Sequence, residues 1–144
     1  MKQNRAFTLI ELLVVIAIIG LLSSVVLASL NSARSKARDA RRISDLHQIQ
    51  TALETYYDKV GSYPPYGTTF VTDDLTVLVP NYIPAFPRDP SVQTALGGTD
   101  YRYSSAGGTA GYAILAFLEK TRTWCQISSG TDAPGLNWAA LPHC

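Results

Sequence analysis

The sequence predicts an α+β fold in which one long N-terminal α-helix packs against a small antiparallel β-sheet. Three observations lead to this prediction. Residues 12–30 carry no charged side chain. A repeat of apolar residues with helical spacing then continues the run to about Lys59. After Ser62 the chain is rich in Gly, Pro, Thr and Tyr, with short apolar runs that favour strands and loops.

The apolar half of the helix, residues 7–30, is long enough to cross a membrane. A helix of about 24 residues spans ~36 Å, and the hydrocarbon core of a bilayer is about 30 Å thick. Inside lipid this segment has to be helical, because no water satisfies its backbone groups there. A cleavable secretory signal is the alternative. The run is longer than the ~7 to 15 apolar residues of such signals and carries a carboxylate, Glu11, near its leading edge. Both features favour a retained membrane helix.

Glu11 is the most informative residue of this half. An acidic side chain in a membrane span costs on the order of 3 kcal/mol on insertion scales, so it is normally paired or functional. In the uncut chain Glu11 lies one turn from Phe7 and could reach the membrane interface. A cut before Phe7 would instead create an α-amine one helical turn from Glu11. In an assembly, that amine could meet the carboxylate of a neighbouring subunit and so specify the register.

The N-terminal motif resembles a known processing signal. Residues 2–6 (KQNRA) and 7–15 (FTLIELLVV) are similar to the class III signal of type IV pilins and type II secretion pseudopilins. The resemblance implies that residues 1–6 are a leader peptide, which a prepilin peptidase removes by cutting between Ala6 and Phe7. It also implies methylation of the new amine of Phe7, and an assembly role for Glu11 as the fifth residue of the processed chain. The family usually has Gly before the cut, where this chain has Ala6.

Five cations follow the apolar run, and they bear on the orientation of the chain. They outnumber Lys2 and Arg5, so the positive-inside rule alone would place the C-terminal part in the cytoplasm. The cysteine pair calls for an oxidising compartment, and the resemblance implies a leader that faces the peptidase in the cytoplasm. Together these two favour a head outside the cytoplasmic membrane. The cations are Arg34, Lys36, Arg38, Arg41 and Arg42.

The same cluster of cations has two interpretations. It could contact anionic lipid before assembly, or DNA. The interpretation that we favour is a solvated helix face, paired in part with Asp39 and Asp45. The net charge of +1 for the whole chain gives no general case for a nucleic-acid-binding protein.

The second half of the helix is predicted to be amphipathic and to carry the head. One helix is expected from about Phe7 to about Lys59, roughly 80 Å long, with Gly61 ending it. The opposite face is expected to be polar and to carry Arg38, Asp45, Gln48 and Lys59. The apolar stripe is Ile43, Leu46, Ile49, Leu53, Tyr56, Tyr57 and Val60.

Three strands are predicted in the second half of the chain, at residues 101–104, 112–118 and 123–127. The last two are separated by residues 119–122, an interval of hairpin size. A sheet laid on the helix would bury Ile114, Ala116 and Leu118. Residues 74–79 form either a small helix or an extended turn.

The order of short motifs in this half also resembles pseudopilins and short pilins, which implies a pilin fold with residues 31–144 as the globular head. The motifs are Tyr56-Tyr57, residues 61–64 (GSYP), 82–84 (YIP), 87–90 (PRDP), 101–103 (YRY) and 112–115 (YAIL).

Cys125 and Cys144 are the two cysteines of the chain. A disulfide between them would close a loop of about 20 residues, worth roughly 3 kcal/mol in the chain-entropy model. Free buried thiols are the alternative. We favour the disulfide because the intervening sequence, which contains Gly and Pro, has little regular structure to hold it in place. A covalent link therefore has a clear purpose there. It resembles the disulfide-bounded C-terminal loop of many pilins. Major pseudopilins generally lack this loop, which favours a pilus.

No cofactor, metal or catalytic centre is expected. His143 beside Cys144, with His47 far upstream, fits no zinc spacing. Related pseudopilins bind calcium near the sheet, and Asp100 or Asp132 could contribute to such a site, but no loop has the spacing of a calcium ligand set. No nucleophile motif, phosphate-binding loop or cluster of histidine and carboxylate appears, so we do not expect an enzyme.

The expected function is that of a structural subunit of a type IV pilus-like extracellular filament, cleaved before Phe7 and polymerised through its N-terminal helix. Its expected partners are copies of itself, the prepilin peptidase, membrane lipid before assembly and, by the resemblance, an assembly ATPase and an inner-membrane platform. The chain would wait in the inner membrane as a single-pass protein with its head outside. The alternatives are a type II secretion pseudopilin, a DNA-binding minor pilin and a membrane-anchored binding module that does not polymerise.

Overall fold

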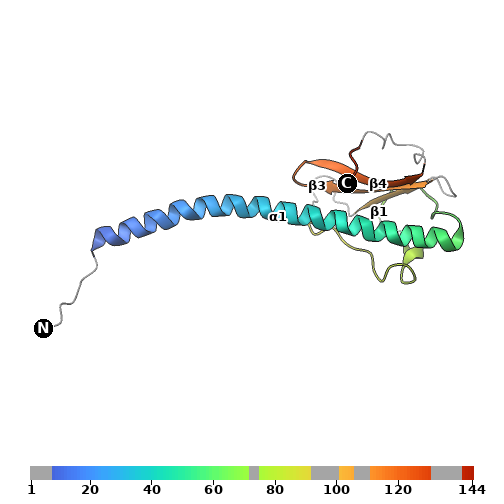
Figure 1. Cartoon of the computed structure of the whole chain (residues 1–144), viewed down its shortest axis with the longest axis horizontal. Coiled ribbons are helices and arrows are strands. Elements are labelled where there is room, and N and C mark those ends of the chain that lie inside the picture. The colour runs from blue at the N-terminus through green and yellow to red at the C-terminus, as the bar shows by residue number, and fades with distance from the viewer. Residues whose placement is uncertain (1–7, 72–74, 92–100, 106–110, 131–140) are drawn as a thin grey trace. The chain divides into compact units, whose positions relative to one another are not determined.

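The computed structural model describes residues 8–71, 75–91, 101–105, 111–130 and 141–144, and it confirms the α+β prediction (Figure 1). The chain divides into two compact units, Met1–Ser35 and Lys36–Cys144. Helix α1 spans Leu9–Val60 and contributes to both units. The remaining elements are β1 (Tyr66–Val71), the short 3-10 helix η2 (Thr76–Leu78), β2 (Arg102–Ser105), β3 (Gly111–Leu118) and β4 (Thr123–Gly130).

The C-terminal end of α1 is set by Gly61, as the sequence predicts. Gly61 adopts the left-handed conformation, with φ +77°. Its N–H donates to the carbonyl O of Tyr57 over 2.7 Å, which is the bond of an αL cap. A residue with a Cβ would be strained in this conformation. The helix therefore stops where the sequence places its first glycine after the apolar stripe.

The four strands form one antiparallel sheet in the order β1-β2-β3-β4. Residues Glu119–Arg122 join β3 to β4, with Leu118 opposite Thr123, so the predicted hairpin is confirmed. At its other end, Gly111 lies opposite Gly130 and has φ +125°. A Cβ on Gly111 would collide with the carbonyl O of Ser129, so this close approach of β3 to β4 requires glycine.

Strand β1 was not predicted from the sequence. Its pairing with β2 is irregular, because the register shifts between the pair Tyr66–Ser105 and the pair Phe70–Tyr103. For residues 74–79, the structure gives a short helix, η2, in place of an extended turn. Asp74 lies outside the described residues.

One face of the sheet packs on the second half of α1 and forms the core of Lys36–Cys144. The predicted inward residues Ile114 and Ala116 are buried there, and Leu118 is half-buried against them. Tyrosine rings fill much of the same space; for example, Tyr57 stacks on Tyr63, whose ring meets Tyr112 edge-on. The helix contributes Leu46, Ile49, Ala52 and Leu53, the sheet contributes Tyr103, Tyr112, Cys125 and Ile127, and Tyr101 comes from the position just before β2.

The predicted polar face of α1 is only partly correct. Gln48 and Lys59 are exposed, but Asp45 is buried and accepts a hydrogen bond of 2.6 Å from the Tyr101 hydroxyl. Burial, and then this bond, raise the pKa of Tyr101. The stripe is wrong at one position, because Val60 is 51% exposed beside the helix end. The buried carboxylate of Asp45 is tolerated because the hydroxyl of Tyr101, the residue just before β2, donates a hydrogen bond to it.

Candidate functional site

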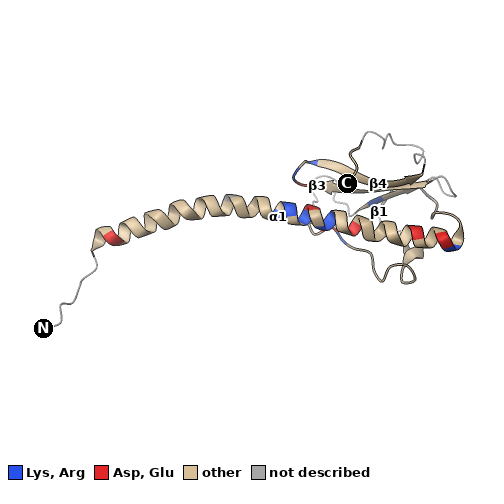
Figure 2. Ribbon diagram, in the orientation of Figure 1, with Lys and Arg blue, Asp and Glu red and all other residues tan. Residues whose placement is uncertain are grey.

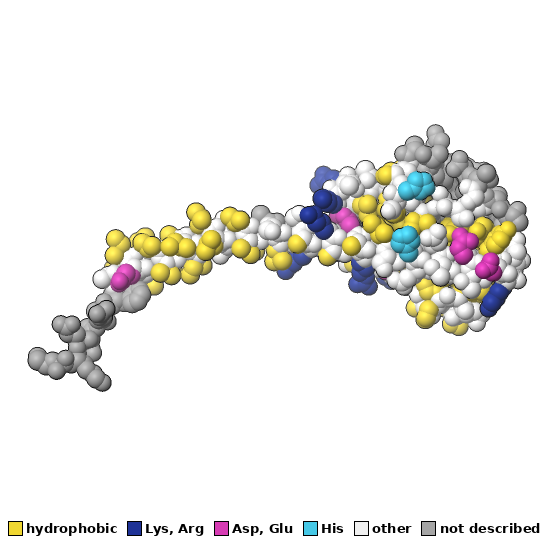
Figure 3. All heavy atoms as spheres, in the orientation of Figure 1, with side chains coloured by type: hydrophobic (Ala, Val, Ile, Leu, Met, Phe, Trp, Pro, Cys, Tyr) yellow, Lys and Arg dark blue, Asp and Glu magenta, His cyan; other side chains and the backbone are white. Residues whose placement is uncertain are grey.

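The described part of Met1–Ser35 is a helix whose apolar side chains are exposed. Fractional exposure runs from 83% at Leu9 to 40% at Leu30, and Figure 3 shows apolar side chains over the visible face of this segment. Residues 12–16 are consecutive and all apolar, so the apolar surface extends around the helix. By length and composition, α1 could cross a membrane. A helix apolar on every side needs lipid or other protein around it.

The start of α1 is a reciprocal hydrogen-bonded box between Thr8 and Glu11. The Glu11 N–H donates to Thr8 Oγ1 over 3.4 Å. In return, Glu11 Oε2 accepts the Thr8 backbone N–H over 2.8 Å and its hydroxyl over 2.6 Å. Such a capping box satisfies backbone N–H groups that have no partner within the helix. Both returning bonds go to Oε2, and among the described residues no hydrogen bond to Glu11 Oε1 is found.

This cap was not predicted, although its signal is present in the sequence. Thr8-Leu9-Ile10-Glu11 before an apolar run is the capping-box pattern. The other predicted processing residues, Ala6 and Phe7, lie outside the described residues, so cleavage, methylation and the Phe7–Glu11 pairing stay predictions.

The head contains a buried charge cluster centred on Arg42, whose side chain is 1% exposed. Its guanidinium donates to Asp39 over 2.7 Å, to Asp89 over 2.7 and 2.8 Å, and to Glu119 over 2.7 Å. It also donates to Ser91 over 2.6 Å. Every partner is an oxygen acceptor at a short distance from the guanidinium group. The planar set of N–H donors of Arg42 therefore points at acceptors on three sides.

This cluster, named here the Arg42 cluster (Asp39, Arg42, Asp89, Ser91 and Glu119), joins three segments of the head. Asp39 and Arg42 come from α1, Asp89 and Ser91 from the connection between η2 and β2, and Glu119 from the β3–β4 turn. Asp39 also accepts the backbone N–H groups of Glu119 and Lys120, over 2.9 and 3.0 Å. The cluster therefore fixes the turn and the connection to the helix.

The favoured interpretation of the cations in residues 34–42 was a solvated helix face. This interpretation is wrong for Arg42, which is buried, and only partly right for Arg38, which is half-buried. The expected pairing of the cluster with Asp39 is present, but Arg42 is buried. Arg38 donates two hydrogen bonds to Glu119, over 2.8 and 2.6 Å. The partners Asp89 and Glu119 lie 47 and 77 residues from Arg42 in the sequence. No spacing rule connects residues so far apart, which is why sequence reasoning missed them.

Glu119 gives the head a defined acid sensitivity. The hydrogen bonds from Arg38, and those from Ser91 and Arg42, lower the pKa of Glu119 to about 2, from an ordinary value of 4.5. Since the folded-state pKa is the lower one, the carboxylate stabilises the head fully above pH 4.5 and loses this contribution as the pH falls toward 2.

We therefore expect Glu119→Gln to be less stable than the parent at pH 7, with the difference shrinking between pH 4.5 and pH 2. The measurement is the free energy of unfolding by denaturant, in detergent solution, over this pH range for both chains. Stability curves that stay parallel through the range would contradict the assignment to Glu119.

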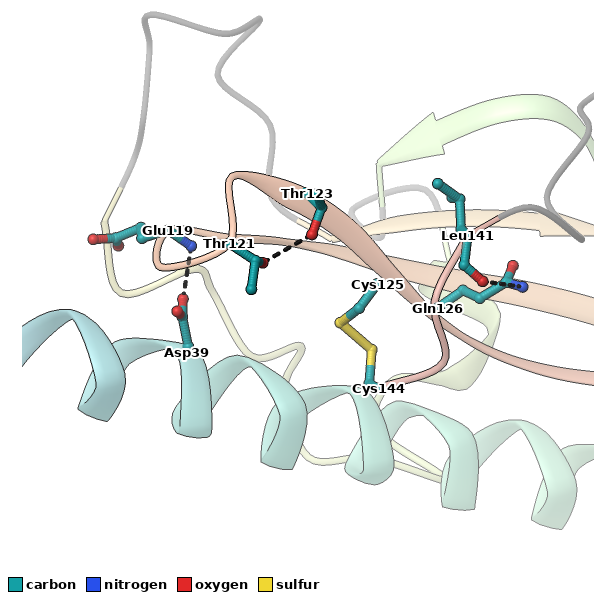
Figure 4. Close-up of a disulfide and its surroundings, with 8 residues drawn as sticks. All are labelled: Asp39, Glu119, Thr121, Thr123, Cys125, Gln126, Leu141 and Cys144. Carbon is teal, nitrogen blue, oxygen red and sulfur yellow. Dashed lines mark hydrogen bonds between the residues drawn. A yellow bond between two sulfur atoms is a disulfide. The ribbon is translucent and has the colours of Figure 1, made fainter.

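Cys125 and Cys144 form a disulfide, as expected, with their Cα atoms 5.2 Å apart (Figure 4). Beside it, the C-terminal residues pair with the outer edge of β4. The Gln126 N–H donates to the carbonyl O of Pro142 over 3.1 Å, and the Cys144 N–H donates to the carbonyl O of Gln126 over 3.0 Å. The tail thus covers backbone groups that an edge strand would otherwise expose, and the disulfide holds it there.

The residues considered for metal binding are not brought together in the described structure. His47 is exposed on α1, where its Nδ1 lies 3.2 Å from Gln50 Oε1. His143 is exposed beside Gln126 in the tail. Among the described residues, no group of three His, Cys, Asp or Glu side chains is arranged so that it could hold a metal ion. Asp100 and Asp132 lie outside them.

Comparison with known proteins agrees with the geometry of the helix and head. Residues 1–27 match the family model described as the prokaryotic N-terminal methylation motif. The type II secretion system core protein G of Escherichia coli (strain K12) is 32% identical over 123 residues, which cover 79% of this chain and 81% of that protein. The chain belongs to the family of type IV pilins and type II secretion pseudopilins.

Other members of the pilin and pseudopilin family are similarly related. The core protein G of Klebsiella pneumoniae is 33% identical over 119 residues, covering 74% of this chain and 79% of that protein. The type IV major fimbrial protein FimA of Dichelobacter nodosus is 26% identical over 136 residues, covering 89% and 85%. No solved structure matches.

Proposed function

We propose that this pilin-family chain is a structural, non-catalytic subunit of a type IV pilus-like extracellular filament, cleaved before Phe7 and polymerised through its N-terminal helix. The observation that carries the proposal is the exposed apolar surface of residues 9–30 in α1. At about 25 cal/mol per Å² of apolar area removed from water, a helix of this length cannot stay solvated. Lipid covers it before assembly, and the helices of neighbouring copies cover it afterwards.

The proposal divides the chain by compartment. Residues 1–6 are a leader that the prepilin peptidase removes on the cytoplasmic side. Residues 7–30 cross the inner membrane and later form the filament core, and residues 31–144 form the head outside, including the amphipathic half of α1. The Cys125–Cys144 disulfide supports a head in an oxidising compartment. By their roles in the family, an assembly ATPase and an inner-membrane platform extract the subunit.

Glu11 is proposed to set the register of the filament. The capping box occupies its Oε2, on which both Thr8 bonds converge. The methylated amine of Phe7 on a neighbouring subunit then pairs with Oε1. A single carboxylate would in this way cap its own helix and bind the helix of the neighbouring subunit. This double role explains why the membrane span keeps an acidic side chain in spite of the free energy that its insertion costs.

A secretion pseudopilin is the second candidate, because the relatives at 32–33% identity are core proteins of type II secretion systems. The disulfide-held tail favours a pilus. The two differ in where the polymer is found, since a pilus is recovered by shearing from the cell surface and a short pseudopilus is not.

Intact mass and N-terminal sequencing of the chain from the native membrane and from the sheared surface fraction test the proposal. We expect a chain that begins at methylated Phe7 in both fractions. Mature chain in the membrane alone would favour the pseudopilin. A chain that begins at Met1 would leave a membrane anchor without processing, and a start beyond Leu27 would make it an ordinary secreted protein.

A further inference from the structure

Four exposed cations lie on two elements of the head that contact each other, although these elements are distant in the sequence. Lys36 and Arg41 lie on α1, and Lys120 and Arg122 lie on the β3–β4 turn, and all four are exposed. Asp39, three residues after Lys36 in α1, accepts hydrogen bonds from the backbone N–H groups of Glu119 and Lys120. The helix and the turn are therefore in contact here. Figure 2 shows basic residues on α1 and on this turn. We name these four residues the basic patch.

The carboxylates nearby are turned inward and do not neutralise the patch. Asp39, Asp89 and Glu119 have side chains only 10–13% exposed, and they bind the guanidinium groups of Arg38 and Arg42. Arg41 is 64% exposed, and its Nε lies 3.9 Å from Asp45, beyond hydrogen-bond distance. Arg38 and Arg42 offset two of the three carboxylates, so the four exposed cations still outnumber the negative charge left beside them, which is one carboxylate of the cluster and Asp45.

Chain connectivity places the basic patch close to the membrane while the span is inserted. Lys36 follows Leu30 by six residues, and even a fully extended chain covers only ~3.3–3.6 Å per residue, or about 20 Å in all. In a helix the same six residues rise about 9 Å. The headgroup layer extends about 5 to 7 Å beyond the hydrocarbon on each side, and the screening length at physiological salt is about 8 Å. A helical connection therefore holds Lys36, the first residue of the patch, within electrostatic reach of the headgroups.

We propose that the basic patch docks the head on anionic phospholipid headgroups while the subunit waits in the membrane. The proposal rests on the proposed function, because it needs residues 7–30 to be inserted. Lipid is favoured over DNA as the partner since the tether keeps headgroup phosphates permanently near the patch. The attraction to an anionic surface is worth about fivefold in the docked-to-undocked ratio for each cation.

The test uses the full chain in vesicles. Replacing Trp138 by Phe leaves Trp124, two residues after Arg122, as the only tryptophan, and its fluorescence is quenched by a nitroxide on the lipid headgroup when the turn approaches the surface. We expect stronger quenching in phosphatidylcholine–phosphatidylglycerol vesicles than in phosphatidylcholine alone. High salt, or neutralisation of all four patch residues to Gln, should remove the difference.

A matched pair of single variants separates the patch from a general loss of charge. Lys120→Gln should lower the docked ratio about fivefold, whereas Lys59→Gln removes an equally exposed lysine from the far end of α1 and should leave it unchanged. Equal effects of the two variants, or equal quenching in both kinds of vesicle, would overturn the proposal.

Two further readouts keep the outcomes apart. Flotation with phosphatidylcholine vesicles measures membrane insertion independently of the basic patch, because these vesicles carry no anionic lipid. A chain that does not float would therefore contradict the proposed function as well as the docking. Duplex DNA is added to the chain in phosphatidylcholine vesicles at the same salt. Patch-dependent DNA binding without lipid-dependent quenching would identify the patch as a nucleic-acid surface and overturn the lipid assignment.

Discussion

Glu11→Ala should insert in the membrane as well as the parent chain and form almost no filaments. The span becomes more apolar, so insertion gains on the order of 3 kcal/mol. In the proposed filament, however, the amine of Phe7 on the neighbouring subunit would be buried without its counter-charge. Removing one partner of a buried ion pair costs about 3 to 5 kcal/mol, which is more than a hundredfold in association at each subunit. Immunoblots of the sheared fraction and of the membrane fraction measure both effects.

Two companion variants separate the charge of Glu11 from its role in the cap. Thr8→Ala removes the capping partner, which costs about 1 kcal/mol, but it keeps the carboxylate and should still assemble. Glu11→Gln keeps an acceptor for the Thr8 N–H and loses the charge, so it should fail like Glu11→Ala. If Glu11→Ala gives the parental amount of filament, the pairing with Phe7 is wrong. If Thr8→Ala fails as completely as Glu11→Ala, the cap is the essential interaction.

Arg42→Met should destabilise the head by about 3 to 5 kcal/mol, because it leaves Asp39 and Asp89 buried without their guanidinium partner and leaves Glu119 with Arg38 alone. Asp39, Asp89 and Glu119 would repel one another, and the β3–β4 turn would lose one of its attachments to α1. Methionine resembles arginine in length, so the loss of charge and hydrogen bonds dominates over the loss of packing. Denaturant unfolding in detergent at pH 7 measures the change in free energy.

Arg41→Met is the matched control for this variant. It changes the adjacent residue in the same way, but the Arg41 side chain is 64% exposed, and we expect a change within about 0.5 kcal/mol. Comparable losses for the two variants would mean that the Arg42 cluster contributes no more than an ordinary surface charge.

Local patterns were sufficient for the main elements. The helix was predicted to run to about Lys59 and ends at Val60, because Gly61 supplies the left-handed cap. Three strands were predicted within a few residues of their observed bounds, since the short apolar run around Ile114 and the hairpin-sized interval after Leu118 are properties of short segments. Such features depend on near neighbours in the sequence, and near neighbours are visible without a structure.

The rest depended on contacts between distant segments. Asp45 was placed in solvent because its partner, the Tyr101 hydroxyl, comes from 56 residues away. Strand β1 contains Gly67, Thr68 and Thr69 after two prolines, which is typical of a loop, and it becomes a strand by pairing with β2. For the candidate site, the sequence singled out Glu11 and the cysteines. It did not predict the burial of Arg42, which only the folded head determines.

For a head that crosses the membrane, as proposed, the strand order β1-β2-β3-β4 has a consequence for how it forms. Every strand lies beside its neighbour in the sequence, so β2, β3 and β4 can pair as soon as each emerges, with short loops to close and little entropy to lose. The bonds from Arg42 to residues 47 and 77 positions later can form only when most of the chain has crossed. We infer that the strands pair while the head is being exported. The hydrogen bonds from Arg42 to Asp89 and Glu119 then form as the last step of folding.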